Sequence, residues 1–393
     1  MDTSEAIHSE LEAQASMEAS WKSSRIGRRL SISQPLPPIP PTSSDRQRAH
    51  AGDQPVDIQA VLHPEAVEEE ERASTDILLE QQTIFYLAYG SNMCAQTFRD
   101  SRKVTPLSQV NVLVPDLTLT FDLPGIAYIE PCFAGTQYRD PATGLPIYPN
   151  DSAARSKLAQ SDSRRNKIWR KPLVGVVYEV TMKDYARIIA TEGGGSSYID
   201  AVVDCYPFRE GFPQTDAVPE FPDTKPFMAH TLLSPSVVGN GHNDKIKFAH
   251  QDGHASHIHK RGLTRPMPNY AQPSRRYRNL LITGAKEHNL PTEYQDYLES
   301  IEPYRVTTTR QLIGKIAMLF LWIPFLLIFL RLGSKFADEY GKSPPWIAAG
   351  QKRIFTVAWW SYDHILKPFF GDGERTMDDH DNSDGDHAAI KLN

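Results

Sequence analysis

The sequence predicts one folded domain that mixes β-strands with α-helices and carries long appendages at both ends. Short apolar runs with strand periodicity occur at residues 84–89, 117–122 and 174–180, and helical spacing follows at residues 274–301. The 30 prolines and 23 glycines lie in segments that show no period. Although 393 residues would suffice for two average domains, these observations favour one domain, at residues 76–305.

The expected strands differ in their burial. Residues 84–89 form an apolar, aromatic run that stops at a glycine, which is typical of a buried strand. Residues 117–122 alternate apolar and polar side chains, which indicates a half-buried strand, and residues 174–180 and 198–206 are two further strands. Thr181 is the expected N-cap of the helix that follows the third strand.

Two helices are expected near the end of the domain, and two inserts interrupt it. Apolar side chains recur at three- and four-residue spacing from Tyr277 onward, and Pro291 begins a second helix. Residues 136–170 and 207–262 are polar, rich in proline, glycine or charge, and aperiodic. Loops of that length are usually surface excursions or functional lids.

The two ends of the chain read as disordered tails. Residues 1–75 are rich in Ser, Pro, Glu and Ala, and they cannot bury enough apolar surface to offset the entropy of ordering. The run from Pro35 to Pro41 favours polyproline II, which is either a stiff spacer or a ligand for a proline-motif-binding partner. Residues 371–393 are expected to be an acidic disordered tail.

The longest uncharged apolar run covers residues 316–330, inside an expected transmembrane helix at 312–332. Lys315 and Arg331 flank this run, where long side chains reach the membrane interface. The alternative is a buried helix of a soluble domain. Residues 345–370 are aromatic and basic, as in an interfacial helix or one that packs back onto the protein. We expect a single-pass membrane protein with a cytosolic catalytic domain and the tail on the other side.

Composition excludes several function classes. With 42 basic and 48 acidic residues, no basic surface indicates nucleic acid, and the amino terminus does not resemble a secretory signal peptide. The sequence lacks a phosphate loop, a dinucleotide fingerprint, a zinc helix motif and a nucleophile elbow. No metal site is expected from the four histidines of the second insert, and three cysteines are not a disulfide framework. The four histidines are His250, His254, His257 and His259, and the three cysteines are Cys94, Cys132 and Cys205.

The first candidate functional segment is Tyr89-Gly90-Ser91-Asn92, at the end of the first strand. Gly90 allows a ligand to approach the backbone closely, and the start of a helix favours an anion. Such a loop could hold a carboxylate or a developing oxyanion. Alone, the tetrapeptide is a weak signal, and an ordinary turn between a strand and a helix explains it better.

The second candidate is Glu192, which lies at a helix end before three glycines. The helix dipole disfavours a carboxylate there, and the glycines are costly in entropy. Burial would raise the pKa of this carboxyl towards the range that suits acid–base work near neutrality. An exposed Glu in a plain helix C-cap is the alternative.

Taken together, these segments resemble the gamma-glutamylcyclotransferase family. The resemblance covers residues 83–303 apart from the inserts, and its carboxy-terminal stretch is the longest and most specific part. The chain's length and tail are similar to those of fungal members. The matching residues are Tyr89-Gly90-Ser91-Asn92-Met93, Glu192-Gly193 with Tyr198, and Pro273-Ser274-Arg275-Arg276-Tyr277 continued through residues 284–291 and Tyr294.

The resemblance implies an α+β fold, a small mixed β-barrel flanked by helices, and a reaction. In that reaction the α-amine of the substrate attacks its own γ-carbonyl, which closes 5-oxoproline and releases an amine or amino acid. No cofactor is implied, because the nucleophile belongs to the substrate. Glu192 would move the proton, and the N–H groups around Gly90, Ser91 and Asn92 would hold the substrate. Tyr198 and Tyr277 would line the pocket, and Tyr89 and Met93 complete the substrate loop.

Three functions remain open at this point. The first is cyclisation of γ-glutamyl amino acids or peptides by a membrane-tethered enzyme. The second is a catalytically silent member that serves as a membrane-anchored binding or scaffold protein. The third is cyclotransfer on γ-glutamyl amines or on a γ-glutamylated secondary metabolite.

Overall fold

The computed structural model describes residues 36–49, 82–146, 169–191, 199–233, 247–248, 270–336 and 344–377. The chain divides into two units, Met1–Pro40 and Pro41–Asn393. Only residues 36–40 of the first unit are described, and they form no helix or strand. Every element discussed below belongs to the second unit.

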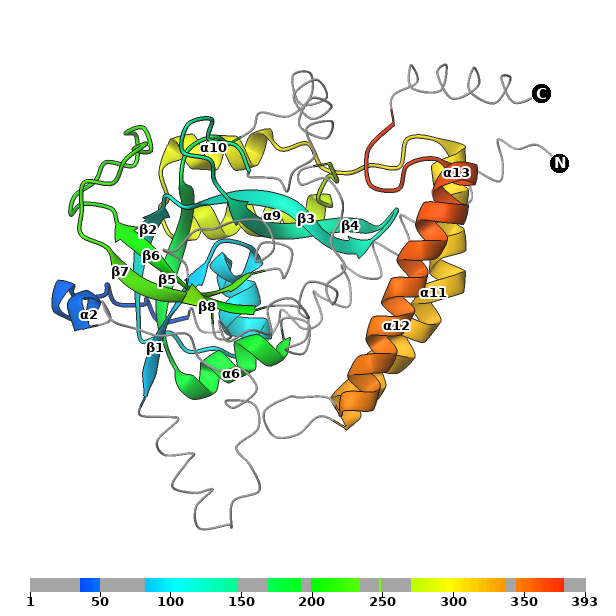
Figure 1. Ribbon diagram of the computed structural model, residues 1–393, viewed down its shortest axis with the longest axis horizontal. Coiled ribbons are helices and arrows are strands. Elements are labelled where there is room, and N and C mark those ends of the chain that lie inside the picture. The colour runs from blue at the N-terminus through cyan, green and yellow to red at the C-terminus, as the bar shows by residue number, and fades with distance from the viewer. Residues whose placement is uncertain are drawn as a thin grey trace, which may run out of the picture. The chain divides into compact units, whose positions relative to one another are not determined.

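Five strands close into a barrel (Figure 1). The strands follow one another in the order β2, β5, β1, β7 and β6, and β6 pairs back with β2 through Leu113 and Tyr206. The β1–β7 pair is parallel and the others are antiparallel, so the barrel is mixed. The strands are β1 (Thr83–Ala88), β2 (Ser108–Val114), β5 (Leu173–Thr181), β6 (Ile199–Pro207) and β7 (Phe227–Leu233). The short strand β8 (Lys247–Phe248) pairs antiparallel with β6 at Ala201 and Val202.

The four predicted strands are confirmed, but residues 117–122 are buried throughout and not half-buried as expected. The strands β2, β7 and β8 and the strand Glu130–Tyr138 were not predicted. β7 lies inside residues 207–262, which the sequence assigned to an insert. Its sequence, FMAHTLL, places His230 and Thr231 among the apolar residues, which conceals the strand pattern. Both polar side chains are buried, because the closed barrel supplies polar partners for them.

The interior of the barrel contains a buried polar cluster that we call the Asp200 cluster: Asp200, His230 and Tyr185. Nδ1 of His230 lies 3.0 Å from a carboxylate oxygen of Asp200, and the Tyr185 hydroxyl donates to the same carboxylate. Burial, followed by the Asp200 charge, raises the pKa of Tyr185 well above its ordinary value, so the phenol stays protonated. The cluster joins α6 (Met182–Thr191), β6 and β7.

A second sheet is a long hairpin of β3 (Leu117–Ile126) and β4 (Glu130–Tyr138), with an irregular register between Thr120 and Leu123. Asp122 lies at this irregularity and is fully buried. Gln137 Nε2 donates to it at 2.6 Å and Thr120 Oγ1 at 2.7 Å. Burial raises the pKa of Asp122 above its usual range. The turn at the tip contains Tyr128 at φ 64°.

The predicted helices are confirmed with their caps. The Thr181 hydroxyl accepts from the N–H of Asp184 at 3.1 Å, as expected for the N-cap of α6. Ser274 caps α9 (Arg275–Glu287) through the N–H of Tyr277, and α10 (Thr292–Ser300) begins directly after Pro291. The Ser274 hydroxyl also donates to Glu130 at the tip of the β3–β4 hairpin.

Residues 41–49, which the sequence placed in the disordered tail, contact the barrel. The N–H of Thr42 donates to Gln109 O at 2.9 Å, and Pro41 forms a bridge with the same residue of β2. Arg46, in the short helix α2 (Ser44–Ala49), forms an ion pair of 2.6 Å with Glu179. The buried carboxylate of Glu179, on β5, therefore explains why residues 41–49 bind to the barrel although they are polar.

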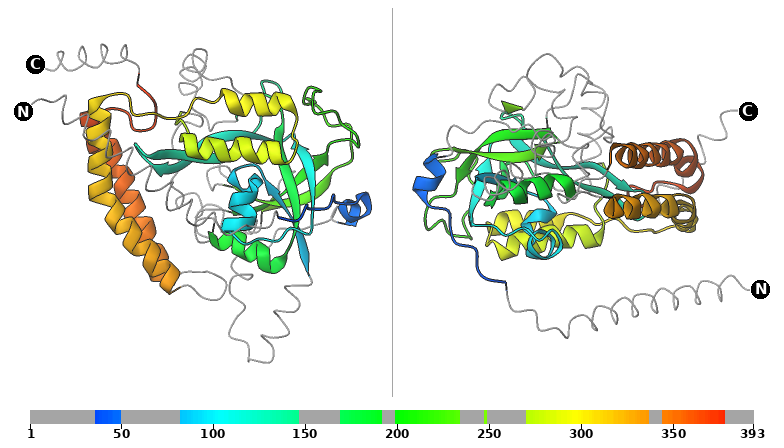
Figure 2. Two further views of the ribbon diagram at one scale, coloured as in Figure 1. Left: turned by 180° about the vertical axis from the view of Figure 1, so that it is seen from behind. Right: turned by 90° about the horizontal axis from the view of Figure 1, so that it is seen from below.

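Two long helices follow the domain and lie side by side (Figure 2). Trp322 Nε1 donates to Ser361 Oγ at 2.9 Å, and Gln351 Nε2 donates to Phe329 O at 3.2 Å, so the helices run antiparallel. The Phe336 and Trp346 rings meet at the far end. We call this pair the C-terminal hairpin; it consists of α11 (Thr309–Lys335) and α12 (Pro345–Ser361), continued by η3 (Tyr362–Leu366) and α13 (Lys367–Phe370).

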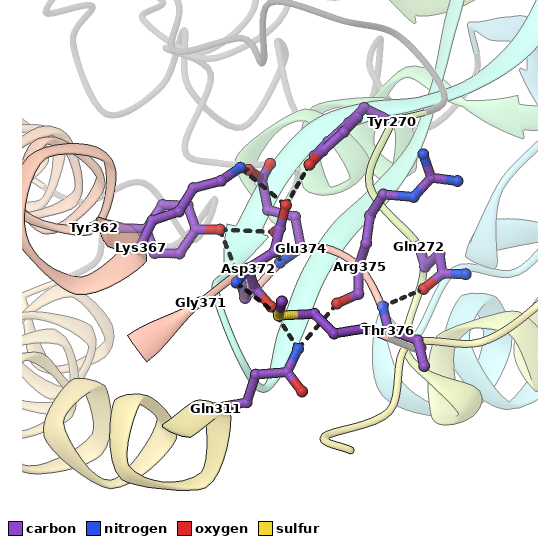
Figure 3. Close-up of polar contacts among 12 residues, drawn as sticks. Tyr270, Gln272, Gln311, Tyr362, Lys367, Gly371, Asp372, Glu374, Arg375 and Thr376 are labelled. Carbon is purple, nitrogen blue, oxygen red and sulfur yellow. Dashed lines mark hydrogen bonds and ion pairs between the residues drawn. The ribbon is translucent and has the colours of Figure 1, made fainter. Parts of the chain in front are cut away.

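After the hairpin, residues 371–377 pack against the domain rather than beginning a free tail. We call them the C-terminal loop. Gln311 Nε2, at the start of α11, donates to Asp372 O at 2.6 Å and to Arg375 O at 3.1 Å (Figure 3). The N–H of Tyr128, in the β3–β4 turn, donates to Gly373 O at 2.7 Å. The chain therefore leaves the domain and returns to it at the same place.

Polar contacts hold the C-terminal loop (Figure 3). The Tyr270 and Tyr362 hydroxyls donate to the Asp372 carboxylate, and Lys367 Nζ lies 3.0 Å from it. Burial works to raise the pKa of Asp372, but Lys367 and the hydrogen bonds hold the pKa below its ordinary value. The N–H of Gln272 donates to Glu374 O at 2.9 Å. A buried anion with a cation and two phenols gives this loop a fixed position.

Candidate active site

The segment at residues 89–93, which we call the substrate loop, connects β1 to a short 3-10 turn, Ser91–Met93. The N–H groups of Met93 and Cys94 donate to Gly90 O and Ser91 O at 3.1 Å, so both donors are used within the turn. Gly90 and Ser91 are half-buried, whereas Asn92 and Met93 are buried. Within residues 90–93, Gly90 and Ser91 are therefore the residues that retain exposed surface.

Gly90 lies beside Tyr277 and Ala134. A Cβ atom added to Gly90 would lie 3.3 Å from the Tyr277 hydroxyl and 3.6 Å from the Ala134 side chain. The N–H of Ala134 donates to the Tyr277 hydroxyl at 3.1 Å. The loop from β1, the middle of β4 and the first turn of α9 therefore meet at one point, where a side chain at position 90 would press on the Tyr277 hydroxyl.

The side chains of the loop hold it against the barrel. Asn92 Nδ2 donates to the Tyr86 hydroxyl at 2.8 Å, and the Tyr89 hydroxyl donates to Leu232 O at 3.1 Å. The Tyr86 ring lies 6.1 Å from that of Tyr185, between centroids. The loop is thereby joined through Tyr86 to the Asp200 cluster.

The last turn of α9 fixes the opposite side of the loop. His288 Nε2 donates to Met93 O at 2.9 Å and contacts the Tyr178 hydroxyl at 2.7 Å. Gly284 lies against the loop backbone, because a Cβ there would be 2.7 Å from Met93 C and Cys94 N. Both residues belong to the carboxy-terminal stretch of the sequence resemblance, although no role was assigned to them from sequence.

We expect Gly284→Ala to separate α9 from the substrate loop. Its methyl group would overlap the loop backbone, and overpacking of this kind costs about 1–3 kcal/mol. A displacement of about 1 Å at a reacting centre can lower the rate about 100-fold. Thermal unfolding and 5-oxoproline release measure the two effects, with Thr283→Ala on the exposed side of the same turn as control. Wild-type turnover in Gly284→Ala would show that this contact does not set the loop.

Burial lowers the pKa of His288 below its ordinary value, against the opposing effect of the bond to Met93 O. The folded state therefore holds His288 neutral, while the unfolded chain takes up a proton near pH 6.5. The stabilising contribution is complete above that pH, and it is lost as the pH falls toward the folded pKa.

We expect the free energy of unfolding to decrease between about pH 7.5 and about pH 5.5, and to do so less in His288→Gln. Gln can donate to Met93 O and does not titrate. Urea unfolding at several pH values measures both slopes. Equal slopes would mean that His288 does not contribute to the pH dependence.

Two of the sequence-predicted site residues lie outside the described part of the chain. Glu192 directly follows the last residue of α6, and Tyr198 directly precedes β6; the four histidines of the second insert also lie outside. Tyr89, Gly90, Ser91, Asn92, Met93 and Tyr277 are described and lie together, as detailed above. Sequence reasoning missed Ala134, Tyr86 and Tyr178, which carry no motif of their own.

The fold and this site define an α+β protein in which a closed mixed barrel presents a glycine-containing loop to a tyrosine on an adjacent helix. The sequence is 26% identical to gamma-glutamyl cyclotransferase gliK of Aspergillus fumigatus over 292 residues, which is 74% of this chain and 89% of the relative. It is 34% identical to gamma-glutamyl cyclotransferase verK of Clonostachys rogersoniana over 155 residues, 39% of this chain and 74% of the relative. The chain therefore belongs to the gamma-glutamyl cyclotransferase family, which confirms the resemblance drawn from its sequence.

Residues 308–369 match a family model described as the AclK C-terminal domain. That range is almost the whole C-terminal hairpin. A solved gamma-glutamyl cyclotransferase is 16% identical, with a TM-score of 0.33 over 58% of this chain and 93% of that chain.

Proposed function

We propose that this chain cyclises the γ-glutamyl group of an amide substrate to 5-oxoproline and releases the amine. The observation that supports this proposal most strongly is the meeting of half-buried Gly90 with Tyr277 and Ala134, in a chain that belongs to this family. Such a site offers polar groups to the γ-glutamyl part, the portion that all such substrates share.

Ring closure needs orientation and the transfer of protons from the α-nitrogen to the leaving nitrogen. The substrate ammonium loses one proton and becomes an amine, whose nitrogen bonds to the γ-carbonyl carbon. The ring nitrogen then loses a second proton, the amide C–N bond breaks, and the leaving nitrogen gains both protons and departs as an ammonium. Holding the γ-glutamyl arm in a folded pose can supply several kcal/mol of the barrier, about 7–11 in favourable cases. We assign the positioning to the substrate loop and the proton transfer to Glu192.

The loop residues divide into two roles in this proposal. The N–H groups of Gly90 and Ser91 are the donors for the substrate carboxylate or the developing oxyanion. Tyr277 is placed to orient the substrate beside them. Asn92 and Met93 are buried and engaged with Tyr86 and His288, so we propose that they position the loop.

A substrate panel tests this function and identifies the leaving group. The full-length chain would be incubated with a γ-glutamyl dipeptide, glutathione, a γ-glutamyl amine and a bulky γ-glutamyl conjugate, and 5-oxoproline would be quantified. We expect release from at least one class, in equal amount to the free amine. Absence of release from every class, with a folded protein that binds them, would favour the catalytically silent alternative.

A further inference from the structure

The C-terminal hairpin exposes apolar side chains that the enzyme domain does not cover. The segment Thr309–Gly333 of α11 is long and apolar enough to cross a membrane, and 11% of its most apolar window is buried. Phe320 is 80% exposed, Phe325 51% and Ile328 53%. The inner face of α11 packs through Met318 on Trp359 and Tyr362 of the returning helix and on Tyr128 of the domain. The outward faces of α11 therefore require another apolar environment.

The returning helix has a different character on its outer side. Lys352, Arg353 and Thr356 are exposed, and so are Asp363 and His364 two turns later. Trp360, which is 54% exposed and stacks on His364, lies between them at four-residue spacing. Together these residues form a stripe of polar side chains and one tryptophan along the side of α12 and η3 that faces away from α11. The hairpin is thus apolar along the middle of α11, whereas the α12 side carries charged and polar side chains together with exposed apolar ones such as Trp360. Such a mixture is typical of a membrane interface.

The uncharged segment of the returning helix is too short for both helices of the hairpin to cross a bilayer. Between Arg353 and Asp363 lie nine residues, which rise about 14 Å at 1.5 Å per residue. A bilayer core is about 30 Å thick. Because Phe329 contacts Gly350 and Gln351, the charges of Lys352 and Arg353 lie alongside the apolar run of α11. A crossing hairpin would bury those charges in hydrocarbon.

The return of the chain also excludes a single crossing for the described residues. Gln311, at the start of α11, donates to the carbonyls of Asp372 and Arg375, which follow α13. Both ends of the hairpin are therefore fixed to the same face of the enzyme domain, beside Tyr128 and Tyr270. This path differs from the single-pass arrangement expected from the sequence.

We propose that the C-terminal hairpin is a monotopic membrane anchor that lies in one leaflet, with the α11 side embedded and the α12 stripe at the headgroups. The described residues of the C-terminal hairpin carry seven cations and one acid, and the connection between α11 and α12 adds Asp338, Glu339 and Lys342 to the sequence. Such a charge balance suits anionic phospholipid, worth about 1 kcal/mol for each cation near the surface. If two copies of the chain associated symmetrically through their hairpins, the cations of one hairpin would face those of the other. The cations are Arg310, Lys315, Arg331, Lys335, Lys352, Arg353 and Lys367, and the acid is Asp363.

The proposal is independent of the reaction and is tested by flotation with preformed vesicles. The full-length chain would be mixed with vesicles of phosphatidylcholine, with or without phosphatidylserine. We expect co-flotation, stronger with phosphatidylserine, and at least about a 10-fold loss in the double variant Phe320→Glu, Phe325→Glu. Thr356→Glu on the polar stripe is the matched control, and it should float as wild type does. If the chain floats with neither vesicle and forms a dimer that the double variant disrupts, the α11 face binds a second copy instead.

Labelling of a single position distinguishes lying in a leaflet from crossing it. Ala349→Cys introduces an exposed thiol near the far end of the hairpin, while the native cysteines Cys94, Cys132 and Cys205 are buried. A membrane-impermeant maleimide added outside the vesicles should label Cys at position 349 in the bound protein as fast as in the free protein. Protection that is relieved only when the vesicles are opened would mean that the tip crosses the bilayer, and would overturn the monotopic arrangement.

Discussion

Glu192→Gln is expected to lower the rate of 5-oxoproline formation by about 100- to 10,000-fold while leaving the fold unchanged. The substitution keeps the size of the side chain and removes the group that can take a proton from the substrate ammonium and return one to the leaving nitrogen. The measurement is single-turnover release of 5-oxoproline, with thermal unfolding to verify the fold.

Glu302→Gln is the matched control, since Glu302 is exposed at the end of the domain. It should keep the wild-type rate. A Glu192→Gln protein with more than about half of the wild-type rate would assign the proton transfer to another group or to solvent.

Asp200→Ala is expected to destabilise the domain by about 2–6 kcal/mol, because it leaves two buried hydrogen-bonding partners unsatisfied at about 1–3 kcal/mol each. Asp200 and His230 are 0% and 1% exposed, so the imidazole and the Tyr185 hydroxyl would each lose their carboxylate without gaining water. Urea unfolding followed by tryptophan fluorescence measures the change.

The control for Asp200→Ala is Asp296→Ala, because Asp296 is exposed on α10. That variant should change the free energy of unfolding by less than about 0.5 kcal/mol. A loss below about 1 kcal/mol in Asp200→Ala would mean that the Asp200 cluster does not stabilise the barrel. Reduced turnover at temperatures where Asp200→Ala is still folded would support the link from this cluster through Tyr86 to the substrate loop.

The sequence predicted the strands whose side chains follow a clear period and the helices whose caps are standard. Thr181 caps α6 as expected, because an N-cap is a local interaction. β7 could not be predicted, since His230 and Thr231 in its centre are polar and their burial depends on Asp200, thirty residues earlier in the chain. The ordered position of Asp372 depends likewise on Lys367, Tyr270 and Tyr362, so the C-terminal loop read as part of an acidic tail.

The candidate site was predicted in part for the same reason. The motif around Gly90 and the helix that contains Tyr277 are each recognisable as contiguous patterns in the sequence. The structure brings them together: a Cβ atom added to Gly90 would lie 3.3 Å from the Tyr277 hydroxyl. Ala134 contributes a backbone N–H, which leaves no trace in residue type. His288 supports the loop through Met93 O, and only tertiary structure reveals that contact.

The most direct test of the proposed reaction is to follow the α-nitrogen of the substrate. A γ-glutamyl dipeptide with ¹⁵N only in the α-amine would be incubated with the full-length chain. The products would be separated, and mass spectrometry would show which of them contains the ¹⁵N. Intramolecular attack places the ¹⁵N in the ring of 5-oxoproline and leaves the released amino acid unlabelled. Formation of ¹⁵N-glutamate in place of 5-oxoproline would show hydrolysis by water and would contradict the proposed cyclotransfer.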